Sequence, residues 1–456
     1  MTDQTDVLSV YAELLARAPE NKMEPRMEPM WRAMELLGDP QNAYPSIHIT
    51  GTNGKTSTAR IIEAGLRAHN LRTGRYTSPH LTSVTERISV DGEPVSDEDF
   101  VRVWDEIRPF VAMVDEELTA RGEPRLTYFE ALTVLAFAVF ADQPVDVAVV
   151  EVGLGGITDA TNVVSGAVSV VTPIGLDHTD LLGDTVRDIA LEKSGILKPG
   201  GFLVSAAQEK EAADVLLERA RELGIPFRFE GVEFGVESRE LAVGGQVLTI
   251  QGLAGRYPDL HLPLHGEHQA ENAAVAVAAL EAFLGGGERE LGREALEQAF
   301  EAVTSPGRLD VVRTDPTVIL DAAHNPDGIR TTTRALKEAF SFSRLVPVVG
   351  ILAEKDAAEF LSVFRRELDD AAGALVLTAS TSPRAIPAAE LEELALAAGW
   401  SEEDIHVTEG LVEALRVAGA LAEEPGDSAG GILVTGSITL VGEAQTLLAK
   451  EDSHGA

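Results

Sequence analysis

Short apolar runs rich in valine and isoleucine alternate with longer stretches of helical periodicity along most of the chain. This alternation is typical of βαβ units, in which helices join parallel strands. Residues 227–263 differ, because strand-like runs there flank the turn signal VGGQ at 243–246, which favours an antiparallel hairpin. The predicted buried strands cover residues 46–50, 145–152, 168–172, 317–320, 346–352, 374–378 and 432–435.

A turn-forming segment divides the chain into two predicted α/β domains. Residues 304–307, TSPG, follow a helical pattern at 293–302 and precede a second series of strands. We predict a P-loop NTPase-like, parallel-sheet N-terminal domain over residues 1–303. After a linker at 304–307, a smaller Rossmann-like α/β C-terminal domain is predicted over residues 308–456.

Composition narrows the classes of function. The 456 residues include 74 acidic and 37 basic side chains, a net charge of -37, and no cysteine. The lack of cysteine excludes disulfides, thiolate metal sites and cysteine nucleophiles. So negative a chain repels nucleic acids and acidic membrane surfaces, and it has no run of the roughly 20 apolar residues that span a bilayer. We expect a cytoplasmic monomer that binds neither nucleic acid nor membrane.

A glycine-rich loop is the first candidate site. A predicted strand leads into residues 51–58, GTNGKTST, and residues 59–69 have helical periodicity. In that context glycines let backbone N–H groups surround phosphate oxygens, while Lys55 reaches the outer phosphates and Thr56 can hold Mg²⁺. Ile49 stands where the strict P-loop pattern has its first glycine, so the loop is a shortened form. We predict that it binds a nucleotide.

Further short motifs follow this loop along the chain. They read YTSPHL (76–81), ERI (86–88), TYFE (127–130), EVGLGG (151–156), DATN (159–162), LDHT (176–179), EKSGI (192–196), PGR (306–308), DAAHNP (321–326) and GS (436–437). One such motif is weak evidence, but the ordered set spans about residues 20–440. The set resembles the folylpolyglutamate and dihydrofolate synthases of the Mur ligase superfamily.

The resemblance implies an ATP-dependent ligase that joins L-glutamate to dihydropteroate, to tetrahydrofolate, or to both. A carboxylate is a poor electrophile, so in this family ATP phosphorylates it and the glutamate amine attacks the acyl phosphate. Transfer among mutually repelling anions depends on positioning and charge neutralisation. The implied products are the amide, ADP and phosphate. The implied cofactor is Mg²⁺, with ATP as co-substrate.

Glu151 is the leading candidate metal ligand. It ends an apolar strand at the edge where open α/β sheets bind ligands, and a buried carboxylate without a partner is costly. Glu151 should therefore have a cation, which by resemblance is Mg²⁺. The resemblance adds Thr56, Ser78 and His178 as ligands. Caps and turns also explain Thr56 and Ser78, a structural histidine explains His178, and Mg²⁺ prefers oxygen to imidazole.

The resemblance also supplies the catalytic, nucleotide and glutamate contacts. Lys193 is implied to carry CO₂ as a carbamate (N6-carboxylysine), whereas its spacing alone favours a solvated surface lysine. An ordinary N-cap and turn also fit Asp321 and the residues after it. The implied catalytic residues are Lys55, Lys193 and His324. The implied ATP-binding residues are Thr52, Asn53, Gly54, Lys55, Thr56, Asn272, Arg308 and Asp321, and the implied glutamate-binding residues are Asp321, His324 and Ser437.

An aromatic segment is the implied pterin site. Residues 127–130 open an apolar helix, where aromatic rings can stack on a flat pterin and Glu130 can pair with ring N–H groups. Core packing explains Phe129 as well. The implied pterin-binding residues are Thr127, Tyr128, Phe129, Glu130, Thr158, Asp159 and Ala160.

Two other functions remain open at this point. One is a related ligase that adds amino acids to a cell-wall precursor, and the other is a non-catalytic nucleotide-binding paralogue. The pterin segment argues against the first. The joint presence of Glu151, His178, Lys193, Arg308 and His324 argues against the second.

Overall fold

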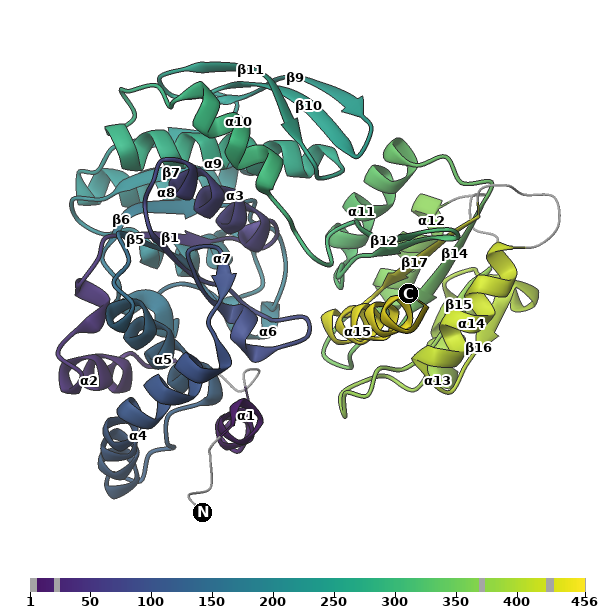
Figure 1. The fold of residues 1–456 in the computed structure, drawn as a ribbon, viewed down its shortest axis with the longest axis horizontal. Coiled ribbons are helices and arrows are strands. Elements are labelled where there is room, and N and C mark those ends of the chain that lie inside the picture. Colours follow the sequence, from purple (N-terminus) through teal and green to yellow (C-terminus); the bar gives the residue numbers. More distant parts are fainter. Residues whose placement is uncertain (1–5, 20–24, 369–373, 424–429, 456) are drawn as a thin grey trace.

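The computed structural model describes residues 6–19, 25–368, 374–423 and 430–455. One large sheet organises the N-terminal part of the chain and a second sheet organises the C-terminal part, which lies beside the first (Figure 1). Both sheets are covered by helices. The predicted α/β fold class, with a parallel-sheet N-terminal part and a separate C-terminal sheet, is confirmed.

The N-terminal sheet has eight strands in the order β4-β3-β2-β5-β1-β6-β7-β8. From β2 to β8 in this order the strands are parallel, and β3 and β4 form an antiparallel edge. The central position of β1 puts the loop that follows it in the middle of the carboxyl edge. The strands are β1 (Ser46–Thr50), β2 (Thr73–Tyr76), β3 (Ile88–Val90), β4 (Glu93–Pro94), β5 (Val147–Glu151), β6 (Gly166–Val171), β7 (Phe202–Ser205) and β8 (Phe227–Phe229).

Helices pack on both faces of this sheet because its strands are apolar on both sides. On one face Ile47 and Ile49 belong to a core that includes α3 (Lys55–Ala68) and α9 (Glu267–Gly285). On the other face Val150 belongs to a core with the long helices α4 and α5. The helices before the C-terminal part are α1 (Val7–Leu15), α2 (Glu28–Leu36), α4 (Asp97–Ala120), α5 (Tyr128–Asp142), α6 (Thr179–Leu182), α7 (Val186–Lys193), α8 (Lys210–Leu223) and α10 (Arg293–Ala302), besides α3 and α9.

The predicted antiparallel segment forms a small sheet of three strands, β9 (Gly235–Ala242), β10 (Gly245–Gln251) and β11 (Arg256–Leu262). Its hairpin turn lies at the VGGQ signal, between β9 and β10. The predicted range began too early, because β8 instead extends the large parallel sheet. The strands β2, β3, β4, β7, β12 (Asp310–Thr314) and β16 (Ile405–Val407) were not predicted. Strand β2 was missed because its sequence, TGRY, places a buried arginine where an apolar residue was expected.

The C-terminal sheet has the order β12-β13-β17-β14-β15-β16. Only β12 is antiparallel to its neighbour. The three strands predicted at 346–352, 374–378 and 432–435 differ from β14, β15 and β17 by one to three residues at their ends, since runs of apolar residues do not mark strand ends. The strands are β12 (Asp310–Thr314), β13 (Thr317–Leu320), β14 (Arg344–Val349), β15 (Leu375–Leu377), β16 (Ile405–Val407) and β17 (Gly430–Thr435), and the helices are α11 (Pro326–Ala339), α12 (Ala357–Leu368), α13 (Ala388–Ala397), α14 (Leu411–Ala422) and α15 (Ile438–Gly455).

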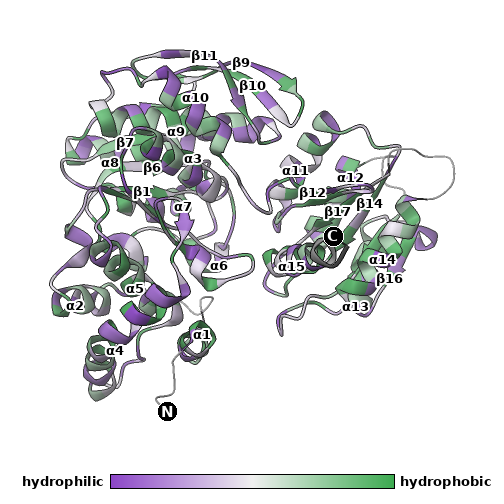
Figure 2. Cartoon of the chain, in the orientation of Figure 1, coloured by the Kyte–Doolittle hydropathy of each residue, from purple (hydrophilic) through white to green (hydrophobic). Residues whose placement is uncertain are grey.

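The outer helices are amphipathic. Figure 2 shows hydrophilic and hydrophobic residues mixed along α4 and α10, as expected for helices with one buried side. Among the described residues, no helix is both long enough and apolar enough to cross a membrane.

Candidate active site

The glycine-rich loop joins β1 to α3, as predicted. Gly54 has a φ of +88°, a left-handed conformation that favours glycine, and any side chain there would collide with the Asn272 amide. Asn272 in turn donates to Gln269 Oε1 at 3.1 Å. On the other side, Thr52 Oγ1 donates to Gly175 O at 3.1 Å and accepts from Gly175 N at 3.0 Å. The loop is therefore held from two sides.

Two lysines converge on one carbonyl of this loop. Lys55 Nζ donates to the carbonyl oxygens of Gly51 and Thr52 at 3.1 Å each, and Lys193 Nζ donates to Gly51 O at 2.8 Å. Lys193 is buried at the end of α7 and is not the surface lysine that its spacing alone favours. Burial lowers the pKa of Lys55. Burial and the nearby charge of Lys55 lower the pKa of Lys193 to about 7.

Glu151 lies beside the start of α3. Its two oxygens accept hydrogen bonds from Thr56 Oγ1 at 2.9 and 3.0 Å, and Oε2 also accepts from Ser78 N at 3.3 Å. Burial raises the pKa of Glu151, and the charge of Lys55 opposes that shift. This geometry joins the side chains of two predicted metal ligands, Thr56 and Glu151, and brings the backbone of a third, Ser78, beside them.

A carboxylate next to a hydroxyl suits Mg²⁺, which takes few protein oxygens and completes its shell with water and phosphate oxygens. In the part of the chain that the structure describes, no group of three or more histidine, aspartate or glutamate side chains could hold a metal ion. The donor set therefore fits an ion that arrives with a nucleotide better than one held by protein ligands alone.

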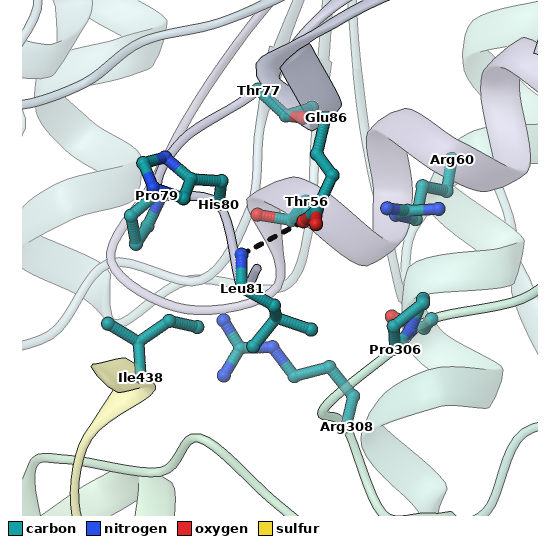
Figure 3. A pocket seen from close by; sticks show the side chains of 11 residues that line it. Thr56, Arg60, Thr77, Pro79, His80, Leu81, Glu86, Pro306, Arg308 and Ile438 are labelled. Atoms are coloured by element: carbon teal, nitrogen blue, oxygen red, sulfur yellow. Dashed lines mark hydrogen bonds between the residues drawn. The ribbon is translucent and has the colours of Figure 1, made fainter. Parts of the chain in front are cut away.

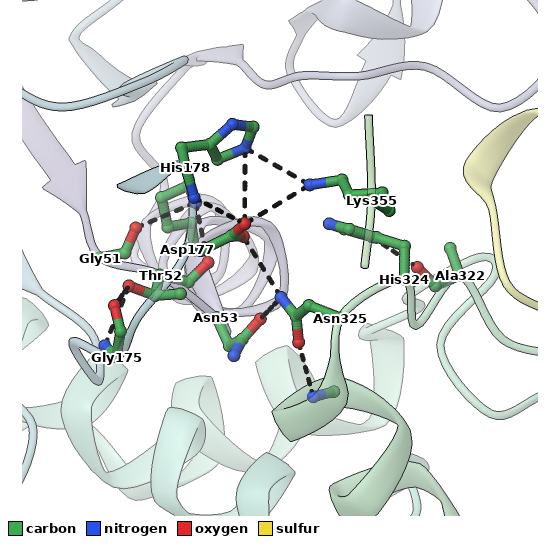
Figure 4. A network of polar contacts seen from close by, with 12 residues as sticks. Gly51, Thr52, Asn53, Gly175, Asp177, His178, Ala322, His324, Asn325 and Lys355 are labelled. Atoms are coloured by element: carbon green, nitrogen blue, oxygen red, sulfur yellow. Dashed lines mark hydrogen bonds and ion pairs between the residues drawn. The ribbon is translucent and has the colours of Figure 1, made fainter. Parts of the chain in front are cut away.

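The fourth predicted metal ligand, His178, belongs to a different network (Figure 4). Lys355 Nζ lies 3.5 Å from His178 Nε2 and 3.5 Å from Asp177 Oδ1. Asn325 Nδ2 donates to Asp177 Oδ2 at 3.2 Å and to Asn53 Oδ1 at 3.4 Å. Burial would raise the pKa of Asp177, but the charges of Lys355 and His178 help lower it to about 2. This network connects the glycine-rich loop to the C-terminal part.

His324 precedes α11 and lies near the same network. Its Nδ1 is 2.9 Å from Ala322 O, and burial together with the charge of Lys355 lowers its pKa to about 4. The imidazole is therefore neutral at pH 7. Asn325 accepts a hydrogen bond from Gly328 N at 2.7 Å and caps α11.

Asp321 forms a hydrogen bond with the backbone directly after Arg308. Its Oδ2 accepts from Leu309 N at 2.9 Å and its Oδ1 accepts from Thr332 Oγ1 at 2.8 Å. Burial raises the pKa of Asp321, and Arg308 opposes that shift. At the end of β17, the buried Ser437 accepts from the backbone N–H of Leu440 at 3.2 Å.

The start of α5 is fixed by a capping box. Thr127 Oγ1 accepts from Glu130 N at 3.2 Å, and Glu130 Oε2 accepts from Thr127 N at 2.7 Å. Arg26 also binds the carboxylate, with its NH2 group 3.1 Å from Oε2. Glu130 is thus largely occupied by its own helix and by Arg26. Tyr128 packs edge-on against Tyr11, at 6.3 Å between ring centroids.

Phe129 connects the aromatic segment to the strand that carries Glu151. Its ring stacks on Tyr76 at 6.0 Å, and Gly153 leaves the space that the ring occupies. Asp159 caps the turn that begins at Ala160, and its Oδ2 accepts from Leu154 N at 3.0 Å. The remaining predicted pterin residue is Thr158, whose backbone N–H donates to Glu192 Oε1 at 3.4 Å.

A small pocket lies where the N-terminal and C-terminal parts meet (Figure 3). Its free volume is about 30 Å³, room for one or two water molecules. The pocket borders the start of α3, the segment 77–81 and the beginning of the C-terminal part. Its lining residues are Thr56, Arg60, Thr77, Pro79, His80, Leu81, Glu86, Ser305, Pro306, Arg308 and Ile438.

Comparison with known proteins decides the family. Residues 49–280 match the Mur ligase middle domain, and residues 307–438 match the Mur ligase glutamate ligase domain. The dihydrofolate synthase/folylpolyglutamate synthase of Mycobacterium tuberculosis is 45% identical, over 98% of this chain and 94% of that protein. This chain belongs to the folylpolyglutamate/dihydrofolate synthase family of Mur ligases. The resemblance drawn from the motifs is confirmed, and with it the assignment to the ATP-dependent ligases.

Solved structures agree with this assignment. Mycobacterium tuberculosis folylpolyglutamate synthase complexed with ADP superposes with a TM-score of 0.91 at 43% identity, covering 97% of this chain and 98% of that one. A folylpolyglutamate synthase complexed with AMPPCP and folate superposes with a TM-score of 0.83 at 32% identity, covering 97% of this chain and all of the other.

Three residues of the site were not singled out from the sequence. Asp177 stands in the motif LDHT beside His178, and its position after a strand could have marked it. Lys355 follows β14, so a charged residue just beyond a buried strand was the available signal. Arg60 lies four residues after Thr56 on the predicted helix, and that spacing places both on one face.

Proposed function

We propose that this chain joins L-glutamate to dihydropteroate, to reduced folates, or to both, with conversion of ATP to ADP and phosphate. The observation that carries the proposal is the contact between Glu151 and Thr56 at the start of α3, beside Lys55. Relatives named as synthases of dihydrofolate and folylpolyglutamate support the substrates, as do relatives in complex with ADP, AMPPCP and folate.

Phosphates of ATP would lie on the glycine-rich loop, where backbone N–H groups and the N-terminus of α3 favour anions. Lys55, already directed at the loop, would neutralise the outer phosphates. Mg²⁺ would be held by Thr56 and Glu151, with Ser78 and His178 completing the predicted set, and would supply the charge that phosphoryl transfer requires. If His178 bound the metal through Nε2, this bond would replace its present contact with Lys355 Nζ, 3.5 Å away.

The C-terminal part would complete the nucleotide and amino-acid sites. We assign Arg308 and Asp321 to ATP together with Thr52, Asn53, Gly54 and Asn272, and we assign Asp321, His324 and Ser437 to L-glutamate. His324, kept neutral by burial, would offer an unprotonated ring nitrogen as a hydrogen-bond acceptor to the glutamate ammonium and so position it. The ammonium must lose a proton before its nitrogen attacks. Exclusion of water between the two parts would protect the acyl phosphate.

The pterin acid would lie along residues 127–130 and 158–160. Phe129, stacked on Tyr76, presents an aromatic surface close to Gly153, two residues beyond Glu151. A ring bound there would direct its carboxylate toward the metal and phosphate. Glu130 is bound to Arg26 and caps α5. In this site Glu130 would therefore hold the start of α5 in place as well as contact the ligand.

The domain bounds at 303 and 308, the monomeric state and the cytoplasmic location remain predictions. The monomer is expected because each predicted site is made from residues of one chain. Size-exclusion chromatography with light scattering tests it, and a dimer that persists at low concentration would contradict it.

Purified protein should be offered MgATP and L-glutamate with dihydropteroate, tetrahydrofolate or a cell-wall precursor in separate reactions, with ADP as the readout. We expect ADP release that requires both glutamate and a pterin acid. Release with the cell-wall precursor alone would favour the other class of ligase, and ATP binding without turnover would favour a non-catalytic role. Lys55→Ala is the matched negative control.

A further inference from the structure

Arg60 is a cationic residue that no predicted role uses. It lies on α3 one turn beyond Thr56, and both side chains line the pocket between the N-terminal and C-terminal parts (Figure 3). Among the described residues, its guanidinium group takes part in no hydrogen bond and no ion pair. The side chain is half-buried, and none of its nitrogens is a buried donor without a partner, so the guanidinium group stays accessible to a ligand from the pocket.

The nearest carboxylates are bound to other groups. Glu63 accepts from Arg75 Nε at 2.5 Å, and both side chains are buried. Glu86 accepts from backbone N–H groups of its own turn, including that of Leu81 at 2.9 Å. Burial and the like charge of Arg75 lower the pKa of Arg60 to about 10, and the charges of Glu63, Glu86 and Glu151 oppose that shift without any of these carboxylates forming a direct contact with Arg60. An anion from outside would supply the missing partner.

The position of the pocket restricts which anion that is. Thr56 forms its wall on the phosphate side, and His80, which lies 3.4 Å from Tyr11 Oη, forms its wall toward the aromatic segment. Ile438, next to Ser437, forms its wall on the C-terminal side. Of the three proposed substrates, the amino acid is the one that must reach all three surfaces, because its nitrogen attacks between the pterin acid and the phosphate.

The size of the pocket fits a part of that substrate. A free volume of about 30 Å³ has room for one or two water-sized groups, such as the two oxygens of a carboxylate. The phosphates of ATP are assigned to Lys55 and to the N-terminus of α3. Both lie about one helical turn from Arg60, so the phosphates do not need Arg60 as a partner. A planar guanidinium binds a carboxylate in a two-pronged geometry that an ammonium group cannot reproduce.

We propose that Arg60 binds a carboxylate of the incoming L-glutamate and so contributes to the choice of amino acid. This inference rests on the proposed function. It assigns to Arg60 a substrate contact distinct from the assignments of Arg308 to ATP and of His324 and Ser437 to glutamate.

Arg60→Gln and Arg60→Lys test the proposal through the Michaelis constants of all three substrates in the ADP assay. Arg60→Gln should raise the KM for glutamate by about 10- to 100-fold, the usual effect of losing a charge-assisted hydrogen bond. Arg60→Lys should give an intermediate KM for glutamate, since lysine keeps the positive charge but cannot form the two-pronged contact of a guanidinium group. The KM values for ATP and the pterin acid should stay within about twofold, because neither substrate touches Arg60.

Arg67→Gln is the matched control. Arg67 lies on the same helix, but its Nε is bound to Asp91 at 3.3 Å at the surface. Thermal melting shows whether each variant is folded. L-Glutamine, which lacks the side-chain carboxylate, separates the two possible contacts. Loss of the preference for glutamate over glutamine in Arg60→Gln would identify the side-chain carboxylate, and equal weakening of both amino acids would identify the main-chain one.

An unchanged glutamate KM in folded Arg60→Gln, or an equal rise in the KM for ATP, would overturn this inference and leave the proposed function intact. A wild-type protein that releases no ADP in response to glutamate with any pterin acid would instead overturn the proposed function, and this inference with it. The two failures are therefore distinguishable.

Discussion

Lys193 offers the sharpest prediction about the chemistry of the site. Its amine shares the Gly51 carbonyl with Lys55, so two ammonium groups would crowd one acceptor if both were charged. Reaction of the neutral amine with CO₂ gives a carbamate and releases one proton. The product is an anion, and it would turn the repulsion between the two lysines into attraction. We expect Lys193 to carry this modification.

The lowered pKa of Lys193 makes the reaction favourable near neutral pH. With a pKa of about 7, roughly half of the amine is neutral at pH 7. A lysine with the ordinary pKa of 10.5 would be neutral in only about 3 molecules in 10,000 at that pH. The reactive form is therefore more abundant by roughly three orders of magnitude. Below pH 7 the amine takes up a proton, so the carbamate should be lost as the pH falls.

Carbon-13 NMR of protein equilibrated with labelled bicarbonate should show a carbamate carbon that Lys193→Gln lacks. Removal of CO₂ should lower activity reversibly, and bicarbonate should restore it. The dependence on bicarbonate should grow as the pH falls through 7. Lys198→Gln is a suitable control, because Lys198 is less buried and binds Asn162 O at 3.4 Å.

Two results would refute this reasoning. One is a labelled protein without a carbamate signal whose activity does not respond to CO₂. The other is a fully active Lys193→Gln, since that side chain can form neither the cation nor the carbamate. A signal that persists in Lys193→Gln would place the modification on another amine.

Three further changes have defined outcomes. Lys55→Ala should lower amide formation by at least about 100-fold, measured as product per minute, because the outer phosphates lose their cation. Asn325→Asp keeps the cap of α11 but places a second carboxylate against Asp177, next to the glycine-rich loop, so it should raise the KM for ATP several-fold. A KM equal to that of the unaltered protein would contradict this. Glu281→Gln should reduce the free energy of unfolding in urea by about 1–3 kcal/mol with activity retained, because its carboxylate accepts from the backbone N–H groups of Leu253, Ala254 and Gly255.

Much of the fold was predictable because its strands are buried on both faces. Residues 46–50 are buried throughout, and residues 317–320 end in three buried apolar residues; the two runs coincide with β1 and β13. The missed strand β2 contains Arg75, whose charge is paired with Glu63 in the interior. A pattern of apolar positions cannot show such a pair, because its partner comes from a helix that is close only after folding.

The site shows the same limit. The glycine-rich loop could be predicted because it lies between a predicted strand and a predicted helix. Glu151 could be predicted because it is a charged residue at the end of an apolar strand. Sequence alone could not show that Lys193 is buried against Gly51 or that His178 faces Lys355. The first contact joins α7 to the loop after β1 within the N-terminal part, and the second depends on how the C-terminal part lies against it. No local pattern encodes either contact.

The distribution of charge explains how so acidic a protein can bind several anions. The net charge of -37 opposes ATP, a pterin acid and glutamate alike. Lys55 and Arg60 come from α3, whereas Arg308 and Lys355 come from the C-terminal part and reach the same region. The positive field is therefore complete only when the two parts are together. Each anion that binds between them should stabilise the closed arrangement, so occupancy by one substrate should strengthen the binding of the next.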